Sequence, residues 1–464
     1  PMPGGLMVRR ASAKIERPSP TATPPSIATF PGPEPVKPMP PAVGPYRSVP
    51  GRVRRPRPRR FPSGRGLRTG SRLSALLLAG LLAGRAEAAP LRVGDAVLEP
   101  VALDALPGFG DDDLTAALAA FRATCRPDQP QAPVLAEAAP DAPRQDLAAA
   151  CAAAAAVPSE GAREFFLRRF AAYRVLRPAR ETPAERRAGF LTGYFEPELD
   201  GSPVPTADFT VPALARPDDL VSLEPGETRP GLDPSLRAAR REGDALTPYP
   251  DRAAIEDGAL GPRTRPLVWL RDAVDLLVLQ VQGSGRVRLP DGRSVRLAYD
   301  GRNGRPYTSV ARLIVTGGHL PLEGLTLERW TGWLRAHPAI ARDLIRRNAS
   351  YIFFRLDDGA PETGPRGAAG APLTAGRSLA VDATLWRYGL PFWLDGALPE
   401  PEGGSVPLRR LVIAQDTGSA IVGPARGDLY FGTGARAGAT AGLLRDPARF
   451  VVLLPKPDAP GAAP

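Results

Sequence analysis

Three aspartates near the carboxyl end of the chain are the side chains whose type and spacing best suggest chemistry. Asp382, Asp416 and Asp428 are expected to close short β-runs in the strings SLAVD, LVIAQD and ARGD, with glycines nearby. Glycine-rich turns allow close approach of the backbone to a ligand. A lone aspartate at a strand end is often a turn former, but three within about 47 residues favour a carboxylate site. Such a site suits general acid and base chemistry.

Histidine and cysteine are too scarce to provide an obvious alternative site. The chain contains two histidines, His319 and His337, and two cysteines. Histidine is the commonest general base, and neither of these two lies in a polar, glycine-rich cluster. The search therefore turns to carboxylates, and we expect no metal ion and no organic cofactor.

The string around Asp416 raises the question of an aspartic protease, because it reads Asp-Thr-Gly-Ser. A pepsin-like protease needs two such turns, so that two carboxylates share one proton. This chain has one, and Gln415 stands where an apolar residue is usual. The protease interpretation is therefore disfavoured.

The charge of the chain is concentrated at its beginning. The 464 residues carry a net charge of +11, of which residues 1–88 contribute +13 and the remainder −2. A basic chain suggests nucleic acid or anionic membrane as a partner. Here the body is nearly neutral, so we expect no binding of nucleic acid.

The beginning of the chain divides into two pieces. Residues 1–67 are rich in Pro and Arg without hydrophobic periodicity, which predicts disorder; they are interpreted as an over-long gene start or, alternatively, a cytoplasmic basic arm. Residues 68–89 combine a basic start, a short apolar run and Ala86-Glu87-Ala88, which is typical of a secretory signal peptide. The alternative is a buried helix. The run is too short for a transmembrane helix.

Export is compatible with a disulfide between Cys125 and Cys151, both of which follow the signal. In an oxidising compartment the two cysteines can form a bridge. The alternative is a pair of buried free thiols.

The elements that must position the aspartates are mainly β. Residues 90–175 are expected to be helical, with Phe165, Phe166 and Phe170 in the core, and short β-runs follow from Phe190. In residues 277–284 the alternation predicts a strand that projects Gln280, Gln282 and Ser284 from one face. Residues 286–297 read as a hairpin. Residues 327–356 read as a helix, or a pair broken by Pro338, followed by a strand.

Five strings in order carry a resemblance to a known family: TGYFEPELDGS, LQVQGSGRVRLPDG, NASYIFFR, PLTAGRSLAVD and AQDTGSAIVGPARGDLYFGTG. Together they resemble the membrane-bound lytic transglycosylase A family of bacterial cell-wall enzymes, and the last two resemble its three-aspartate (3D) domain. The resemblance implies a double-psi β-barrel, with N-terminal helices, built from residues 90–202 and 353–464. It also implies a second β-domain inserted as residues 203–352, with a glycan groove between the two.

The same resemblance implies an activity and a site. The family cleaves the bond between N-acetylmuramic acid and N-acetylglucosamine and leaves 1,6-anhydromuramic ends. Asp428 matches the catalytic acid, and Asp416 and Asp382 match supporting residues. The groove residues are Tyr194, Glu196, Gln282, Ser284, Gly418 and Tyr430. The implied partner is the peptidoglycan strand, in the periplasm of a Gram-negative bacterium, with outer-membrane association although no lipid-anchor cysteine is seen. We expect a monomer that can join cell-wall synthesis complexes.

One carboxyl group is chemically sufficient for this reaction, because the attacking C6 hydroxyl of muramic acid is already tethered to the reacting centre. The acid must be protonated at rest, which requires a pKa raised by burial or by a second carboxylate. Activity should then fall as pH rises through that pKa. Two alternatives stay open: a barrel that binds glycan without cutting it, and a hydrolase that uses Glu196 or Asp416 as a second carboxylate.

Overall fold

The computed structural model describes residues 91–125, 147–178, 182, 187–223, 227–357, 359 and 363–456, all within one unit of the chain, Arg85–Pro464. The expected Pro- and Arg-rich arm and signal peptide, residues 1–89, lie outside the described residues.

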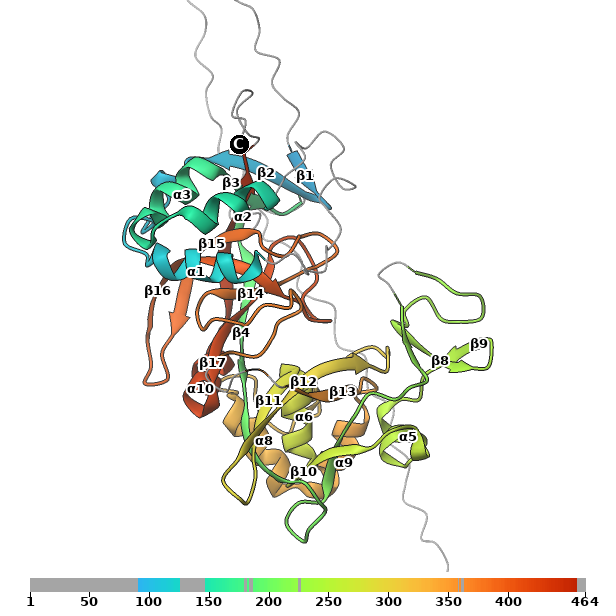
Figure 1. The fold of residues 1–464 in the computed structure, drawn as a ribbon. Coiled ribbons are helices and arrows are strands. Elements are labelled where there is room, and N and C mark those ends of the chain that lie inside the picture. The colour runs from blue at the N-terminus through green and yellow to red at the C-terminus, as the bar shows by residue number, and fades with distance from the viewer. Residues whose placement is uncertain are drawn as a thin grey trace, which may run out of the picture. The chain divides into compact units, whose positions relative to one another are not determined.

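A closed barrel of six strands positions the three aspartates. Figure 1 shows this part of the chain, with most of the barrel strands labelled. The strands pair in the order β18-β15-β16-β14-β17-β4, and the barrel closes because β4 pairs with both β17 and β18. The pairs β14–β16 and β4–β17 are parallel. The barrel strands are β4 (Gly189–Glu196), β14 (Ser378–Val381), β15 (Pro391–Pro399), β16 (Ser405–Asp416), β17 (Arg426–Thr433) and β18 (Arg445–Pro455). This arrangement confirms the expected fold, a mainly β protein with a double-psi barrel.

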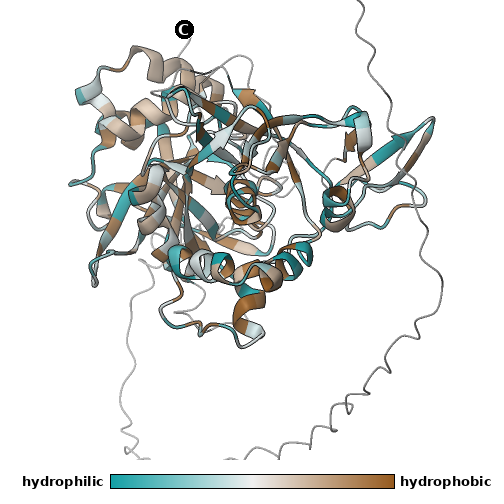
Figure 2. Cartoon of the chain, turned by 90° about the horizontal axis from the view of Figure 1, so that it is seen from below, coloured by the Kyte–Doolittle hydropathy of each residue, from teal (hydrophilic) through white to brown (hydrophobic). Residues whose placement is uncertain are grey.

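The barrel core follows from continuous apolar runs in these strands. Leu411, Val412, Ile413 and Ala414 of β16 are all buried, as are residues 450–454 of β18. Strands that are covered on both faces read as unbroken hydrophobic segments. Figure 2 shows hydrophobic and hydrophilic residues side by side along most of the other elements, which is the pattern of elements with one covered face.

The N-terminal layer combines strands and helices. Its strands extend the barrel sheet outward from β18, and its helices pack near β16. The elements are β1 (Leu91–Val93), β2 (Ala96–Val101), η1 (Leu103–Ala105), α1 (Leu114–Thr124), α2 (Leu147–Ala156), η2 (Ser159–Gly161), α3 (Ala162–Arg169) and β3 (Phe170–Leu176). The helical expectation for residues 90–175 was therefore wrong at both ends of the segment. Alternating buried positions in residues 96–101 make that stretch a strand.

An aspartate side chain caps the start of helix α1. The Asp113 carboxylate accepts a hydrogen bond from the Ala116 N–H, which satisfies one of the free donors at the helix start. Phe121 of this helix packs against Phe165, Phe166 and Phe170 with ring centroids 5.6–6.3 Å apart. The three predicted core phenylalanines are at most 4% exposed, so that prediction is confirmed.

A second six-stranded sheet forms the insert. Its order is β13-β12-β11-β5-β10-β6, and an isolated bridge between Ala215 and Phe354 joins the two edges. The strands are β5 (Glu198–Ser202), β6 (Val211–Leu214), β10 (Pro266–Leu270), β11 (Ser284–Arg288), β12 (Ser294–Arg302) and β13 (Ile352–Asp357). By strand pairing the insert thus extends from Glu198 to Asp357, a few residues beyond the expected 203–352 at each end.

The remaining elements are a small sheet and several helices. The small sheet consists of β7 (Leu220–Ser222), β8 (Ala238–Glu242) and β9 (Ala245–Pro248). The helices are α5 (Arg252–Glu256), η3 (Gly261–Arg263), α6 (Ala273–Gln282), α7 (Val310–Thr316), α8 (Leu327–Ala336), α9 (Pro338–Arg346) and α10 (Gly434–Leu443). Strands β11 and β12 confirm the hairpin predicted for residues 286–297. Helices α8 and α9, which meet at Pro338, and strand β13 after them confirm the predicted helix pair and strand.

The strand predicted for residues 277–284 was wrong, because most of this segment is helix α6. Asp272 caps the helix by accepting from the Asp275 N–H, and Gly283 ends it with φ of +80°. Leu276 and Leu279 enter one apolar cluster and Leu277 another, so the helix is apolar nearly all round. A short apolar run is ambiguous by periodicity, and the two caps decide it.

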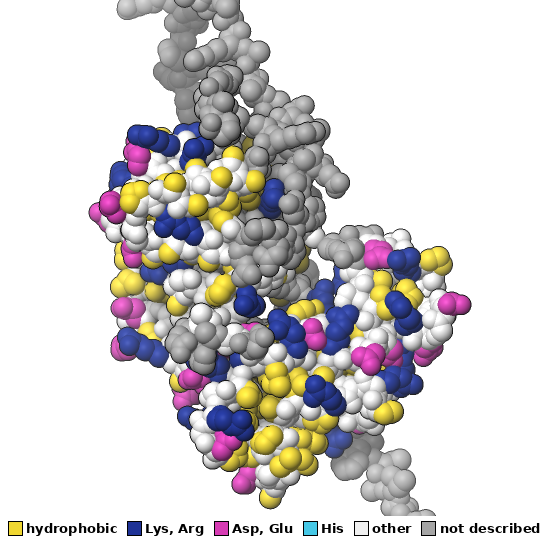
Figure 3. Space-filling view, viewed as in Figure 1, with side chains coloured by type: hydrophobic (Ala, Val, Ile, Leu, Met, Phe, Trp, Pro, Cys, Tyr) yellow, Lys and Arg dark blue, Asp and Glu magenta, His cyan; other side chains and the backbone are white. Residues whose placement is uncertain are grey.

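On the face shown in Figure 3, acidic and basic side chains are interspersed over the described residues. That pattern agrees with the near-neutral charge of the body of the chain. Within the described ranges, none of the helices is long and apolar enough to span a bilayer.

Candidate active site

Strand β14 brings two of the three aspartates together. Its residue Ala380 pairs with Asp416 of β16 on one side and with Asp428 of β17 on the other. Side chains directly opposite one another in neighbouring strands project from the same face of a sheet. Asp416 ends its strand as predicted, whereas Asp428 is the third residue of β17 and does not close a strand.

The Asp428 carboxyl group is half-buried. Its Oδ1 atom accepts a 2.6 Å hydrogen bond from the Thr192 hydroxyl of β4. Burial raises its pKa from 3.8 to about 6; Thr192 and Arg426 oppose the rise and Asp416 adds to it. Among the described residues, no hydrogen bond is made to Oδ2. Near pH 6 about half of this carboxyl group is protonated, so it can present a proton there.

Asp416 is organised differently, because both of its oxygens already accept hydrogen bonds. Oδ1 accepts from the Ala368 N–H at 3.0 Å and the Thr417 N–H at 2.9 Å. Oδ2 accepts from the Tyr194 hydroxyl at 2.9 Å. Burial raises the pKa of Asp416, and these three bonds lower it. Burial is the larger effect, so the pKa of Asp416 stays above its usual value. Because donors occupy both of its oxygens, Asp416 is suited to act as a fixed acceptor.

Asp382 orders the turns around the site. It follows β14, its Oδ1 accepts from the Thr384 N–H at 3.0 Å and the Thr384 hydroxyl at 2.6 Å, and its Oδ2 accepts from the Gly423 N–H at 2.7 Å. The side chain is only 6% exposed. This aspartate therefore ties the loop after Asp416 to the end of β14.

Two tyrosines predicted to line the groove lie beside this site. Tyr194 and Tyr430 are paired in register across β4 and β17, with ring centroids 5.3 Å apart. Burial and the Asp416 charge hold the pKa of Tyr194 well above its usual range. Tyr194 is therefore a hydrogen-bond donor at every physiological pH. Tyr430 is nearly fully buried and makes a long 3.4 Å contact with the Thr433 hydroxyl.

The other predicted groove residues are spread over several elements. Gln282, the last residue of α6, accepts a hydrogen bond from the Phe195 N–H at 3.1 Å, and Ser284 opens β11. Gly418 is exposed in the loop after Asp416. Gln280, expected on the same face as Gln282 and Ser284, is instead buried against Arg252 and the Ile352 carbonyl.

Glu196 does not line an open surface. Its side chain is 0% exposed and forms ion pairs with Arg286 at 3.0 Å and Arg296 at 2.7 Å, while the Thr433 hydroxyl donates to it at 2.8 Å. The expected contact of Glu196 with substrate was therefore wrong. The residue ends β4 at the point where the chain passes from the barrel into the insert, and it ties β11, β12 and β17 together.

Thr192 and Arg426 were missed by the sequence analysis. Thr192 precedes Tyr194 by two residues and so shares its face of the strand. Arg426 precedes Asp428 by two residues and shares that strand's face in the same way. The two-residue spacing in both strings indicates which side chains share a strand face. Only the pairing of β4 with β17 in the folded protein shows that Thr192 lies next to Asp428.

The opposite face of β4 borders a cavity of about 120 Å³. Gly193 and Phe195 alternate with Thr192 and Tyr194 and contribute to its lining. The other lining residues come from the barrel helix α10 and its flank and from the insert: Gln282, Ala311, Leu325, Leu327, Trp330, Ala441, Gly442 and Arg445.

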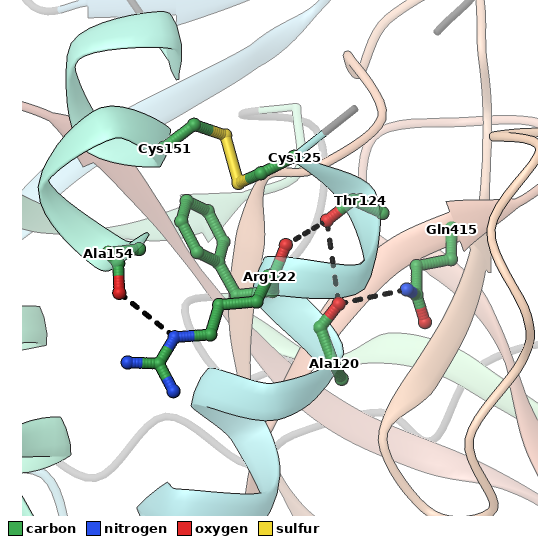
Figure 4. The surroundings of a disulfide bond; sticks show 8 residues. Ala120, Arg122, Thr124, Cys125, Cys151, Ala154 and Gln415 are labelled. Atoms are coloured by element: carbon green, nitrogen blue, oxygen red, sulfur yellow. Dashed lines mark hydrogen bonds between the residues drawn. A yellow bond between two sulfur atoms is a disulfide. The ribbon is translucent and has the colours of Figure 1, made fainter. Parts of the chain in front are cut away.

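A disulfide joins two of the N-terminal helices to each other, and a hydrogen bond connects α1 to the site (Figure 4). Cys125, which follows α1, is bonded to Cys151 of α2. The Gln415 side chain donates to the Ala120 carbonyl of α1 at 3.0 Å and accepts from the Ser378 hydroxyl of β14. The residue preceding Asp416 is thus held from two sides, which fixes the backbone that carries this carboxylate.

Two family models match the chain: the MltA specific insert domain over residues 190–355 and the 3D domain over residues 377–454. A crystal structure of membrane-bound lytic murein transglycosylase from Agrobacterium tumefaciens is 33% identical, with a TM-score of 0.65, over 77% of this chain and 97% of that one. MltA from Neisseria gonorrhoeae is 30% identical, with a TM-score of 0.63, over 81% of this chain and 97% of that one.

A curated relative gives the same result over a shorter stretch. Membrane-bound lytic murein transglycosylase A of Vibrio cholerae is 33% identical over 198 residues, which are 42% of this chain and 52% of that protein. The chain thus spans about half the length of this curated relative. The chain has a closed barrel that carries three aspartates, and a second β-domain is inserted into it. These features place it in the class of 3D-domain proteins with an inserted domain. The chain belongs to the MltA family of membrane-bound lytic murein transglycosylases.

Proposed function

We propose that this protein is an exported lytic transglycosylase of peptidoglycan, with Asp428 as its single acid and base. The observation that carries the proposal is the contrast among the three aspartates. Asp416 and Asp382 use both oxygens as acceptors, whereas Asp428 has one oxygen without a partner among the described residues and a pKa raised to about 6. The names of the relatives, lytic murein transglycosylases, support the same substrate.

The proposed reaction needs no water. Protonated Asp428 donates its proton to the glycosidic oxygen as the bond from that oxygen to C1 of N-acetylmuramic acid breaks. The C6 hydroxyl oxygen of the same sugar then bonds to C1, and the Asp428 carboxylate takes up the hydroxyl proton. One carboxyl group serves both steps and returns to its starting state. Asp416 and Tyr194 would present fixed polar groups to the sugar, and Gln282, Ser284 and Gly418 are proposed to border the bound strand. Tyr430, which is nearly fully buried, would support Tyr194 through their ring contact.

The hydrolase alternative is weakened by the same geometry. A glycosidase that uses water needs a second carboxylate across from the acid. Glu196 is buried between two arginines, and Asp416 is held by three donors. Neither is free to act as a nucleophile or to activate water.

The proposed setting follows the family. We assign the catalytic domain to the two chain segments that flank the insert, and we place the protein in the periplasm of a Gram-negative bacterium, associated with the outer membrane. We propose that it acts as a monomer and can join cell-wall synthesis complexes.

A digest of purified peptidoglycan sacculi tests the proposal. Residues 90–464 of the wild type and of Asp428→Asn are incubated with sacculi, and soluble products are identified by mass spectrometry. We expect anhydromuropeptides from the wild type and none from the variant. Products heavier by one water, about 18 Da, would indicate a hydrolase. Retention on sacculi without any product would indicate a glycan-binding protein.

A further inference from the structure

We propose that Thr192 and Arg426 are positioning residues that keep Oδ1 of Asp428 a hydrogen-bond acceptor and thereby hold the transferable proton on Oδ2. The inference rests on the proposed function of Asp428. It adds two residues, and it states which of the two carboxyl oxygens carries the proton.

The geometry begins with the Thr192 hydroxyl, which has a neighbour on each side. Arg426 donates from Nη2 to the hydroxyl oxygen at 2.9 Å, and the hydroxyl donates to Asp428 Oδ1 at 2.6 Å. A hydroxyl group has a single proton and can both donate and accept. Arginine can only donate, so the Arg426 contact occupies a lone pair and directs the Thr192 proton toward Asp428.

This orientation has a consequence for the location of the proton on Asp428. If Oδ1 carried the proton, that proton and the Thr192 proton would compete for the short space between the two oxygens. Thr192 would have to turn its own proton away, and a half-buried donor without an acceptor is costly. A proton on Oδ2 leaves the Thr192 bond intact. Oδ2 is the oxygen to which no described residue hydrogen-bonds, so the proton is also available to a substrate oxygen.

Arg426 is itself restrained from binding Asp428 directly. Its Nη1 donates to the Gly427 carbonyl and, at 3.5 Å, to the Phe190 carbonyl, and its guanidinium lies 5.2 Å from the centre of the Phe190 ring. A direct ion pair with arginine would strongly favour the ionised carboxylate. Arg426 makes hydrogen bonds to Thr192, Gly427 and Phe190 and none to Asp428 among the described residues. Its charge therefore lowers the pKa of Asp428 without a direct ion pair, and the carboxyl group can still be protonated.

The other charged and titratable groups facing Asp428 are few. Arg426 on β17 and Asp416 on β16 act on its pKa in opposite directions, and its charge in turn acts on Tyr194 of β4. From β14 the residue opposite is Ala380, and Asp382 follows at the end of that strand. Replacing Thr192 removes none of these charged groups, and it deletes the hydroxyl that links Arg426 to Asp428.

The decisive experiment is the pH–rate profile of anhydromuropeptide release from sacculi for Thr192→Val, Thr192→Ser and Asp428→Asn. Thr115→Val, which removes a hydroxyl that bonds to the Ser159 carbonyl far from the site, is the matched control. The alkaline limb is the part of the profile in which the rate falls as pH rises through the pKa of Asp428. At pH values below this limb we expect the rate of Thr192→Val to be roughly ten-fold lower than that of the wild type. We also expect the limb to shift to higher pH, because a bond that stabilises the carboxylate is lost. Thr192→Ser should restore both.

The possible outcomes separate the two proposals. If Asp428→Asn is inactive and Thr192→Val has the wild-type rate and limb, this inference is wrong and the proposed function stands. If Asp428→Asn is active, the proposed function fails and the inference fails with it. If Thr192→Val does not fold, as judged by its melting curve, Arg426→Gln takes its place. Its limb should also move to higher pH, and an unchanged limb would refute the positioning role.

Discussion

At the scale of single residues, three identical side chains acquire different properties from their hydrogen-bond partners. Asp382 and Asp416 each accept three hydrogen bonds, shared between both oxygens, whereas Asp428 accepts one, from a hydroxyl, at one oxygen. A general acid must hold its proton at the working pH. The assignment of the acid therefore depends on which oxygens remain available, and the residue type alone does not distinguish the three.

The raised pKa of Asp428 predicts the pH dependence of the reaction. The protonated form is the active one, and its pKa is about 6. The rate should therefore be highest below pH 6 and should fall about ten-fold for each pH unit above it. Initial rates of anhydromuropeptide release between pH 4 and pH 8 measure this, with melting curves at each pH as the control for folding. A rate that rises across that range would contradict the acid role.

At the scale of elements, the end of β4 connects the barrel to the insert. Glu196 is followed by Pro197 and then by β5, and its carboxylate is fully buried between Arg286 of β11 and Arg296 of β12. Asp357, where the insert returns toward the barrel, also lies 3.6 Å from Arg296. Both crossings of the chain thus meet at one cluster of charges. We interpret these ion pairs as the contacts that fix the position of the insert relative to β4, the strand that carries Thr192 and Tyr194.

Removing the charge of Glu196 should destabilise the protein. Glu196→Gln leaves two arginines with a weakened partner, and breaking a buried ion pair destabilises by about 3 kcal/mol or more. Glu198→Gln, an exposed residue on the following strand, is the matched control and should change the free energy of unfolding by less than about 0.5 kcal/mol. Chemical denaturation of both variants measures the difference. Equal stability of the two would show that the cluster is not a stabilising connection.

At the scale of the whole molecule, the barrel is assembled from segments far apart in the chain. Strand β4 comes before the insert and β14 to β18 come after it, and the Thr192–Asp428 hydrogen bond joins residues 236 positions apart. The N-terminal helices reach the same region through the Gln415 bond to Ala120. Folding of the site therefore requires both halves of the barrel and is supported by the helical layer.

The disulfide should stabilise this layer. Cys125 and Cys151 are 26 positions apart, and closing a loop of that length restricts the unfolded chain by about 3.5 kcal/mol in the chain-entropy estimate. Cys125→Ala with Cys151→Ala should therefore lower the free energy of unfolding by about 2–4 kcal/mol. Denaturation with and without reductant measures this, since reductant should destabilise the wild type and leave the double variant unchanged. A double variant as stable as the oxidised wild type would exclude this role.

The sequence by itself determined the local features. The hairpin at residues 286–297 and the break at Pro338 could be read from neighbouring residues, because each depends on interactions between residues close together in the chain. The burial of Phe165, Phe166 and Phe170 could be read from their hydrophobicity, although they pack against Phe121 of α1. The ordered motifs also indicated the family and its fold. The prediction failed at residues 277–284, where a short apolar run suits a strand as well as a buried helix.

Only the tertiary structure decided which carboxyl groups are available. Asp416 and Asp428 lie together because both strands pair with Ala380, and Glu196 is withdrawn from any open surface because two arginines of the insert enclose it. Burial, pKa and hydrogen-bond partners are properties of the assembled surroundings, which here come from strands more than 200 residues apart. A linear sequence names the candidate acids, but it does not state which of their oxygens stays free.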